Sequence, residues 1–108
     1  MVRWCLPGVV LLLAAASAAA QSDEAPSTKG YRDAMTKMHQ GMMIPYTGDA
    51  DKDFVAGMIA HHQGAIDMAK VELQYGKDKQ LRALARNIIA AQQKEIAFMQ
   101  AWQAKHAK

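Results

Sequence analysis

The fold is decided by residues 51–78, which read DKDFVAGMIAHHQGAIDMAKVELQYGKD. Asp51 is predicted to cap a helix and Asp53 to lie in its first turn, because acidic side chains stabilise helix N-termini. This helix is predicted to end at Gly76, which accepts the left-handed conformation common after helices. Asp78 is predicted to cap another helix. A turn this short makes the two helices antiparallel neighbours.

Before this pair of helices, a first helix is predicted from residue 27 or 28 to about Met43. Pro45 and Gly48 mark residues 44–50 as a connection, and the last helix is predicted to reach about His106. The chain has no alternating pattern typical of β-strands. We therefore expect an all-α, up-down antiparallel helical bundle of three main helices, with dimerisation as one way of completing it.

The first twenty residues have the pattern of a secretory signal peptide. Arg3 supplies a short positive region, Leu6 to Ala16 is almost entirely apolar, and residues 18–20 are three alanines. The apolar run is shorter than the ~20 residues that span a bilayer. We expect cleavage after residue 20 and a periplasmic or secreted protein, with an uncleaved anchor as the alternative.

Cleavage would leave residues 21–108, divided into a polar tether (21–27) and a helical domain (28–108). This length excludes Rossmann domains and TIM barrels. Cys5 is the only cysteine and leaves with the signal peptide, which excludes zinc fingers, thiol redox chemistry and iron–sulfur clusters. The basic residues do not cluster, so the sequence does not favour nucleic-acid binding.

Two series of side chains recur at alternating steps of three and four residues, which places each series on one helix face. Both series become polar in their interiors, and buried polar groups need partners. In the second helix the series is Phe54, Met58, His61, Ala65, Met68, Glu72 and Tyr75. In the third it is Leu81, Ala85, Ile88, Gln92, Glu95, Met99, Trp102 and His106.

Antiparallel pairing across the turn predicts which residues of these two helices lie at the same level. His61 and His62 fall opposite residues 92 and 93, one turn from Glu95, and Met58 falls one turn from Met99. Adjacent histidines differ by about 100° around the axis, so they point to different sides. On the first helix, Met35, Met38 and His39 are expected opposite residues 60, 57 and 56, although the connection allows a shift of one turn.

Soft side chains are therefore expected to gather from three helices. Seven of the eight methionines lie beyond residue 20, and thioethers beside imidazoles favour copper, above all Cu(I). Silver(I) is similarly soft, and Cu(II) would use the histidines and Glu95. Zinc prefers cysteine or carboxylate ligands with histidine, and calcium requires oxygen ligands. The candidate metal ligands are Met35, Met38, His39, Met42, Met58, His61, His62, Met68, Glu95 and Met99.

Structural interpretations of the same residues are also open. A stripe of methionines at helical spacing is more often core than ligand. A lone histidine such as His39 or His106 is usually an ordinary surface side chain. Glu95 could instead form a salt bridge with Lys70 or Arg82.

The sequence resembles the domain-of-unknown-function 305 family. Residues 51–69 (DKDFVAGMIAHHQGAIDMA) are similar to its signature, residues 75–78 (YGKD) and the spacing from Leu81 to Trp102 also match, and the resemblance extends over residues 31–102. The sequence differs from the family pattern at Ala60 and Lys79, where many members have proline. These differences affect the expected helix geometry and not the expected ligands. The family is described as ferritin-like, and several members are exported copper- or silver-binding proteins implicated in metal resistance. The resemblance marks Met58, His61, His62 and Met68, and it suggests Met38, His39, Met42, Glu95 and Met99.

The sequence therefore predicts an exported copper-binding protein that sequesters or delivers the ion, with a periplasmic copper transport partner. It has no nucleophile–histidine arrangement or phosphate-binding glycine loop, so we do not expect an enzyme. Alternatives are a metal-independent periplasmic interaction or chaperone module and a small copper redox enzyme. Gly57 and Gly64, near Ala60, indicate close approach of another helix, which we expect to be a homodimer contact or the first helix.

Overall fold

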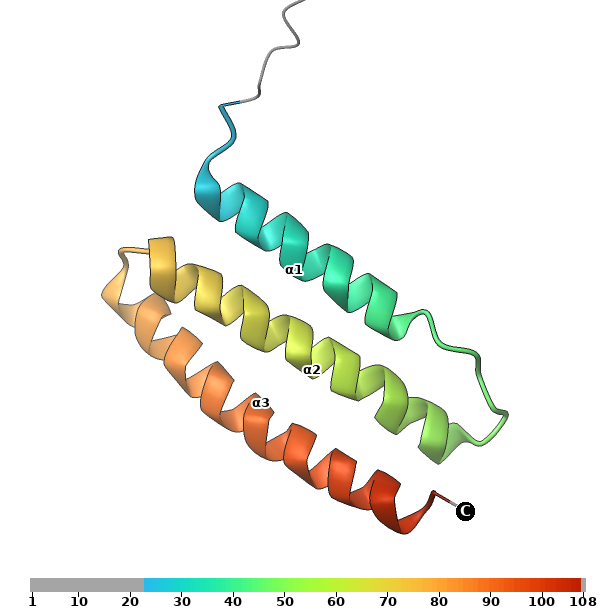
Figure 1. Ribbon diagram of the computed structural model, residues 1–108. Coiled ribbons are helices and arrows are strands. Elements are labelled where there is room, and N and C mark those ends of the chain that lie inside the picture. The colour runs from blue at the N-terminus through green and yellow to red at the C-terminus, as the bar shows by residue number, and fades with distance from the viewer. Residues whose placement is uncertain (1–22, 108) are drawn as a thin grey trace, which may run out of the picture.

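The computed structural model describes residues 23–107 and contains three helices joined by two connections. Helix α1 spans Pro26–Met42, α2 spans Ala50–Tyr75 and α3 spans Lys79–Lys105. Successive helices run in opposite directions (Figure 1). The all-α class and the up-down antiparallel order predicted from the sequence are confirmed.

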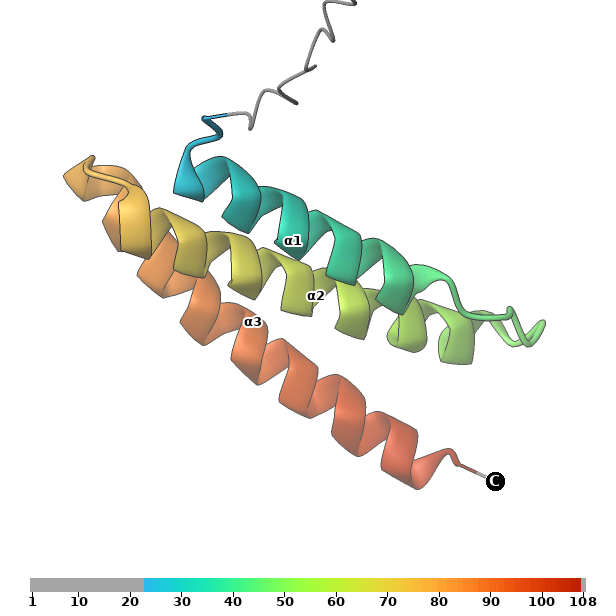
Figure 2. The same cartoon turned by 45° about the horizontal axis from the view of Figure 1, so that its top comes forward.

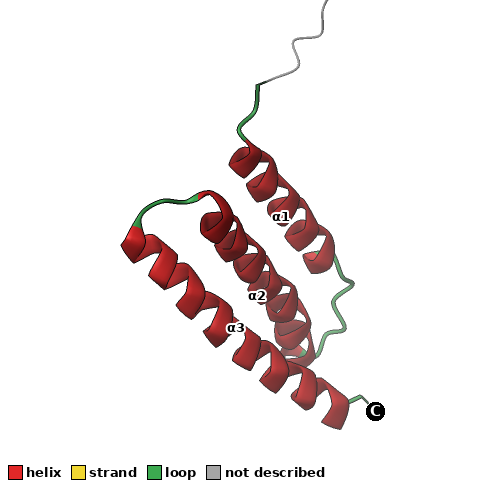
Figure 3. Cartoon of the chain, turned by 60° about the vertical axis from the view of Figure 1, so that its left-hand side comes forward, coloured by secondary structure: helices red, strands yellow, loops and turns green. Residues whose placement is uncertain are grey.

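The middle helix holds the molecule together. Helix α2 packs against both α1 and α3, whereas α1 and α3 do not pack against each other. Figures 2 and 3 show α2 between its two neighbours from different directions. The described chain is therefore a single layer of helices, and α2 uses two opposite sides for its contacts.

The start of α2 is fixed by two aspartates. Asp49, rather than the predicted Asp51, is the N-cap, and its side chain accepts hydrogen bonds from the backbone N–H groups of Asp51 and Lys52 at 3.1 and 3.2 Å. Asp53 accepts from the backbone N–H of Thr47 at 2.9 Å and from its hydroxyl at 2.8 Å. The first turn of α2 thus anchors the connection that precedes it.

The turn between α2 and α3 differs from its prediction at Gly76. This glycine has φ −69° and ψ 152°, which is extended and not left-handed. Arg82 explains the difference, because its Nη1 donates to the carbonyl oxygens of Leu73 and Gly76 at 2.6 and 3.0 Å and so satisfies backbone groups at the helix end. Asp78 caps α3 as predicted, accepting from the N–H of Leu81 at 2.9 Å.

Small residues bring α1 and α2 together. A Cβ atom placed on Gly64 would lie 2.6 Å from the Sδ atom of Met38, and one on Gly41 would lie 3.0 Å from the Cβ of Ala60. The close approach expected at Gly64 is therefore made by α1 of the same chain. The predicted register was wrong, because Met38 lies level with Gly64 rather than residue 57, a displacement of about two turns. The extended connection after α1 permits this displacement.

The buried side of α2 toward α3 also differs from its prediction. Val55, His62, Ile66 and Ala69 are buried and share one side of the helix by their spacing. The predicted series lies beside this buried side, since Phe54 is 62% exposed and His61 is exposed, although Phe54 and Met58 still line a hollow with α3. Because α2 packs on two sides, this series lies between α1 and α3 and lines hollows with residues of both helices.

The predicted signal peptide lies outside the described residues, as do residues 21 and 22 of the proposed tether. Residues 23–25 precede the first helix, and residues 26 and 27 belong to α1, so the tether predicted over 21–27 extends two residues too far. Helix α1 begins at Pro26, which suits a first helical position because proline has no N–H to leave unsatisfied. No helix within residues 23–107 has both the length and the apolar character needed to cross a membrane.

Candidate metal centre

A hollow of about 230 Å³ lies between α2 and α3. Its walls combine two thioethers, one imidazole, one carboxylate and two aromatic rings. Every one of these side chains comes from the helices on either side of the short turn. The lining residues are Phe54, Met58, His62, Glu95, Phe98 and Met99.

His62 is the buried polar group of this hollow. Its side chain is only 9% exposed, and its Nε2 atom contacts the Oε2 atom of Glu95 across the two helices. An ionised carboxylate only accepts hydrogen bonds, so Nε2 carries the hydrogen, and in the neutral imidazole Nδ1 then keeps a free lone pair. Nδ1 is buried and has no hydrogen-bond partner among the described residues. His62 therefore presents an unused donor atom of the kind that binds metals.

The contact between Glu95 and His62 has a recognised role in metal sites. A ligating imidazole usually donates its second N–H to a carboxylate or carbonyl, which fixes the tautomer and the ring orientation. Glu95 keeps 61% of its side chain exposed, so this carboxylate joins the hollow to solvent. Glu95 pairs with His62 and not with Lys70 or Arg82, the salt-bridge partners that the sequence suggested.

The two thioethers reach the hollow by helical spacing. Met58 lies four residues before His62, and Met99 lies four residues after Glu95, so each pair shares one side of its helix. Met99 is 6% exposed and Met58 is half-buried. The level predicted from the turn agrees with the structure to within one turn: His62, expected one turn from Glu95, contacts it, and Met58 shares the hollow with Met99.

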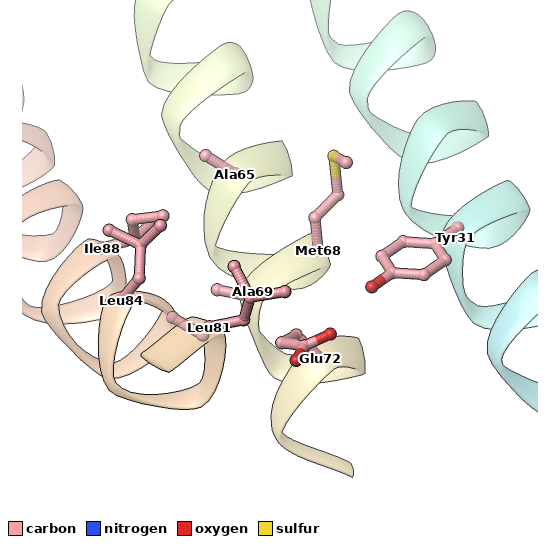
Figure 4. A pocket seen from close by; sticks show the side chains of 9 residues that line it. Tyr31, Ala65, Met68, Ala69, Glu72, Leu81, Leu84 and Ile88 are labelled. Carbon is pink, nitrogen blue, oxygen red and sulfur yellow. The ribbon is translucent and has the colours of Figure 1, made fainter. Parts of the chain in front are cut away.

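The other candidate ligands on α2 lie elsewhere. His61 is exposed and does not line the hollow, as expected from its rotation of about 100° from His62. Met68 lines a separate groove with Tyr31 and Glu72 (Figure 4). His61 and His62 therefore lie in different environments, and Met68 does not line the hollow that contains Met58.

The candidates on α1 do not reach the hollow between α2 and α3. Met38 packs on Gly64, and Met35 and His39 are exposed. Met42 lines a neighbouring groove in which Phe54 and Met58 also take part. Met58 and Phe54 line both hollows and therefore connect Met42 to the centre.

Phe54 and Phe98 belong to the hollow but were not among the candidate ligands. Sulfur makes favourable contacts with aromatic rings, and apolar walls keep water away from a bound ion. Phe54 could have been recognised because it precedes Met58 and His62 at successive four-residue steps. Phe98 carried no comparable signal, since it lies outside the predicted series.

Within residues 23–107, no three His, Cys, Asp or Glu side chains gather closely enough to hold a metal ion. The four polar and sulfur side chains of the hollow comprise one imidazole, one carboxylate and two thioethers. A metal bound here would depend on sulfur from methionine, and such ligands select soft ions.

Fold and site together define a small up-down helical protein with a methionine–histidine hollow between two helices. The chain belongs to the family described as "Domain of unknown function (DUF305)", whose model matches residues 11–103. It is also similar to an uncharacterized protein of Acanthamoeba polyphaga mimivirus, with 45% identity over 49 residues. That match covers 45% of this chain and 32% of the relative, so it spans about one third of the relative's length.

Proposed function

We propose that this protein binds copper, preferentially as Cu(I), and sequesters the ion or delivers it to another protein. The observation that carries the proposal is that Met58, Met99 and His62 line one hollow, and that the Nδ1 atom of His62 is buried without a hydrogen-bond partner among the described residues. A purely structural core would be expected to leave no buried imidazole nitrogen without a partner, because such groups are costly.

The donor set supports a soft ion. Two thioethers and an imidazole suit Cu(I), and silver(I) would be accepted by the same atoms. Cu(II) would rely on His62 and Glu95, the two harder ligands of the group. Calcium and magnesium are disfavoured because the hollow offers a single carboxylate.

Each side chain has a task in this proposal. Glu95 orients the His62 ring, Met58 and Met99 supply sulfur, and the Phe54 and Phe98 rings limit access of water. Glu95 is exposed enough to sample the surrounding solution, which suits an ion that must enter and leave. We place the protein in the periplasm or outside the cell after removal of residues 1–20, with a periplasmic copper transport partner.

The adjacent histidines provide the decisive test. Cu(I) affinity is measured anaerobically by competition with a chelator for the purified protein and for His62→Gln and His61→Gln. We expect His62→Gln to weaken Cu(I) binding at least about tenfold, as the loss of one ligand should. His61→Gln, its matched control, is expected to bind nearly as the unmodified protein does, because His61 lies outside the hollow.

Glu95→Gln extends this test to the supporting carboxylate. The amide keeps the shape of the side chain but loses its charge, and we expect an affinity loss of about 10- to 100-fold with unchanged helicity. Equal affinity of the unmodified protein, His62→Gln and Glu95→Gln would show that the hollow is a structural core and would contradict the proposal.

A metal-independent interaction module is the second candidate, and the exposed aromatic and aliphatic side chains on α2 and α3 favour it. Phe98 is 72% exposed and Leu84 is 52% exposed. Partner binding that is unchanged after removal of all metals would support this candidate over copper binding.

A further inference from the structure

One side of the helical layer carries most of the exposed apolar side chains. Phe54, Met58, Ala65 and Met68 share one side of α2 by spacing, and they line three hollows that join it to both neighbouring helices. We call this side the apolar face. Its large exposed members on α2 and α3 are Phe54, Met68, Leu81, Leu84 and Phe98, and on α1 they are Tyr31, Met35 and Met42, which share one side of that helix by spacing.

The apolar face has no lysine or arginine among the residues that line its three hollows. The cations point elsewhere: Lys37 pairs with Asp67 at 3.8 Å, and Arg82 donates to backbone carbonyls of the turn. Lys52 lines a hollow near the connection before α2, roughly opposite Phe54 and Met58 around the helix. An anionic membrane or nucleic acid would find no complementary charge on the apolar face.

The described chain has a thin core of its own. Its buried apolar residues are mostly alanine and valine, and none of its large side chains is less than 2% exposed. Helical layers normally bury their apolar side against a second layer, and small chains often obtain the missing core by oligomerisation. The missing layer must be largely apolar, which describes the apolar face itself. Three carboxylates also line its hollows: Asp53 and Glu95 already have partners, and Glu72 lies near the end of α2.

The area is sufficient for a specific contact. The eight large side chains of the apolar face together expose on the order of 800 Å², which is what each partner buries in a standard interface. Two such faces joined by a two-fold axis would place the same patch on both sides of the interface.

We propose that the apolar face is the interface of a homodimer, in which two three-helix layers pack face to face around a shared core. This interface differs from the glycine side of α2, because α1 already covers Gly64 there. The metal hollow is walled by Phe54 and Phe98, which belong to the apolar face. A consequence that rests on the proposed function is that the second copy closes this hollow to water.

The test is the mass of the metal-free protein by sedimentation equilibrium, from low to high micromolar concentration. We expect a dimer. Leu84→Lys places a charge in the interface, in the hollow that Glu72 also lines. We expect it to raise the dimer dissociation constant at least about 100-fold, because removing an ammonium group from water is unfavourable even beside a carboxylate. Leu84 is 52% exposed in the single chain, so helicity by circular dichroism is expected to stay unchanged.

Gln74→Lys is the matched control, since Gln74 is exposed and lies on the side of α2 away from the apolar face. It is expected to leave the dimer intact. A monomer at every concentration would overturn the proposal, and so would a dimer that Leu84→Lys does not weaken more than Gln74→Lys. If far-UV spectra show that Leu84→Lys is unfolded, Phe98→Lys is used as the decisive variant in its place.

Copper affinity is measured separately on the monomeric variant and on the control. If closure by the second copy protects the hollow, the monomer binds Cu(I) about tenfold or more weakly than the dimer. A metal-free dimer without copper binding would retain the interface and remove the proposed function. Copper binding by a protein that is monomeric at every concentration would retain the proposed function and remove the interface.

Discussion

At the scale of single residues, His61 and His62 are adjacent in the chain but lie in different environments. His62 is buried against Glu95, whereas His61 faces outward. The 100° step of the helix causes this difference. One histidine is therefore part of the candidate centre, and the other belongs to the exposed side of α2.

Asp53, at the start of α2, also has a property that its local surroundings determine, namely its pKa. Hydrogen bonds from the backbone N–H and hydroxyl of Thr47, and from the N–H of Gly48, hold the pKa of the Asp53 carboxyl below its usual range. A lowered pKa in the folded state means that ionised Asp53 stabilises the fold above the pKa of the unfolded chain. This contribution is lost as the pH falls through the folded pKa.

We expect the amide resonances of Thr47 and Gly48 to titrate together, with a midpoint below that of free aspartate. Nuclear magnetic resonance spectra recorded between neutral and strongly acidic pH measure this midpoint. In Asp53→Asn the same resonances are expected to lose the transition. A midpoint at or above the ordinary aspartate value would contradict the bonding described for this connection.

At the scale of elements, the interface between α1 and α2 depends on glycine in a helix. Glycine destabilises a helix interior by about 1 kcal/mol relative to alanine, so it is retained where a larger residue does not fit. A Cβ at Gly64 would lie within 2.9 Å of three Met38 atoms, including the Met38 Cβ near the backbone. Nothing lies within 4 Å of a Cβ at Gly57.

These two glycines predict opposite effects of the same substitution. Gly64→Ala is expected to lower the free energy of unfolding by about 1–2 kcal/mol, because overcrowding outweighs the gain in helix propensity. Gly57→Ala is expected to raise it by about 0.5–1 kcal/mol. Urea denaturation of the metal-free variants measures both, and stabilisation by Gly64→Ala would mean that α1 does not pack as described.

At the scale of the whole molecule, the proposed ion would link α2 to α3. A ligand that binds only the folded state stabilises it according to its concentration relative to its dissociation constant. The thin core of the single chain makes this contribution large compared with the total stability of a small domain.

We expect Cu(I) at 100 times its dissociation constant to stabilise the fold by about 2.7 kcal/mol, which corresponds to a rise in Tm of about 10 °C or more. Anaerobic thermal melts measure this rise. Met99→Leu conserves side-chain volume but removes the sulfur, so the rise is expected to shrink.

Met43→Leu is the control for this measurement, because Met43 is 82% exposed and lies outside the hollow. It is expected to keep the full rise in Tm. Equal losses in Met99→Leu and Met43→Leu would indicate that copper binds dispersed surface thioethers instead of one centre.

The class, the number and the order of the helices could be predicted from the sequence. Local signals were enough, because Asp78, the short turn and the three- and four-residue spacings act within a few residues of one another. The same turn also determined the meeting of His62 with Glu95, since a short connection leaves little freedom in the level of two antiparallel helices.

The sides that α2 turns to its neighbours and the level of α1 depend on the packing of the whole molecule. Rotation of a helix about its axis depends on all of its contacts at once, and α2 packs on both sides, so Phe54 is exposed instead of buried. The longer connection before α2 leaves the level of α1 free, and the fit of Met38 against Gly64 determines it. For this reason the sequence placed Met38 at the centre, whereas the structure builds the centre from α2 and α3 alone.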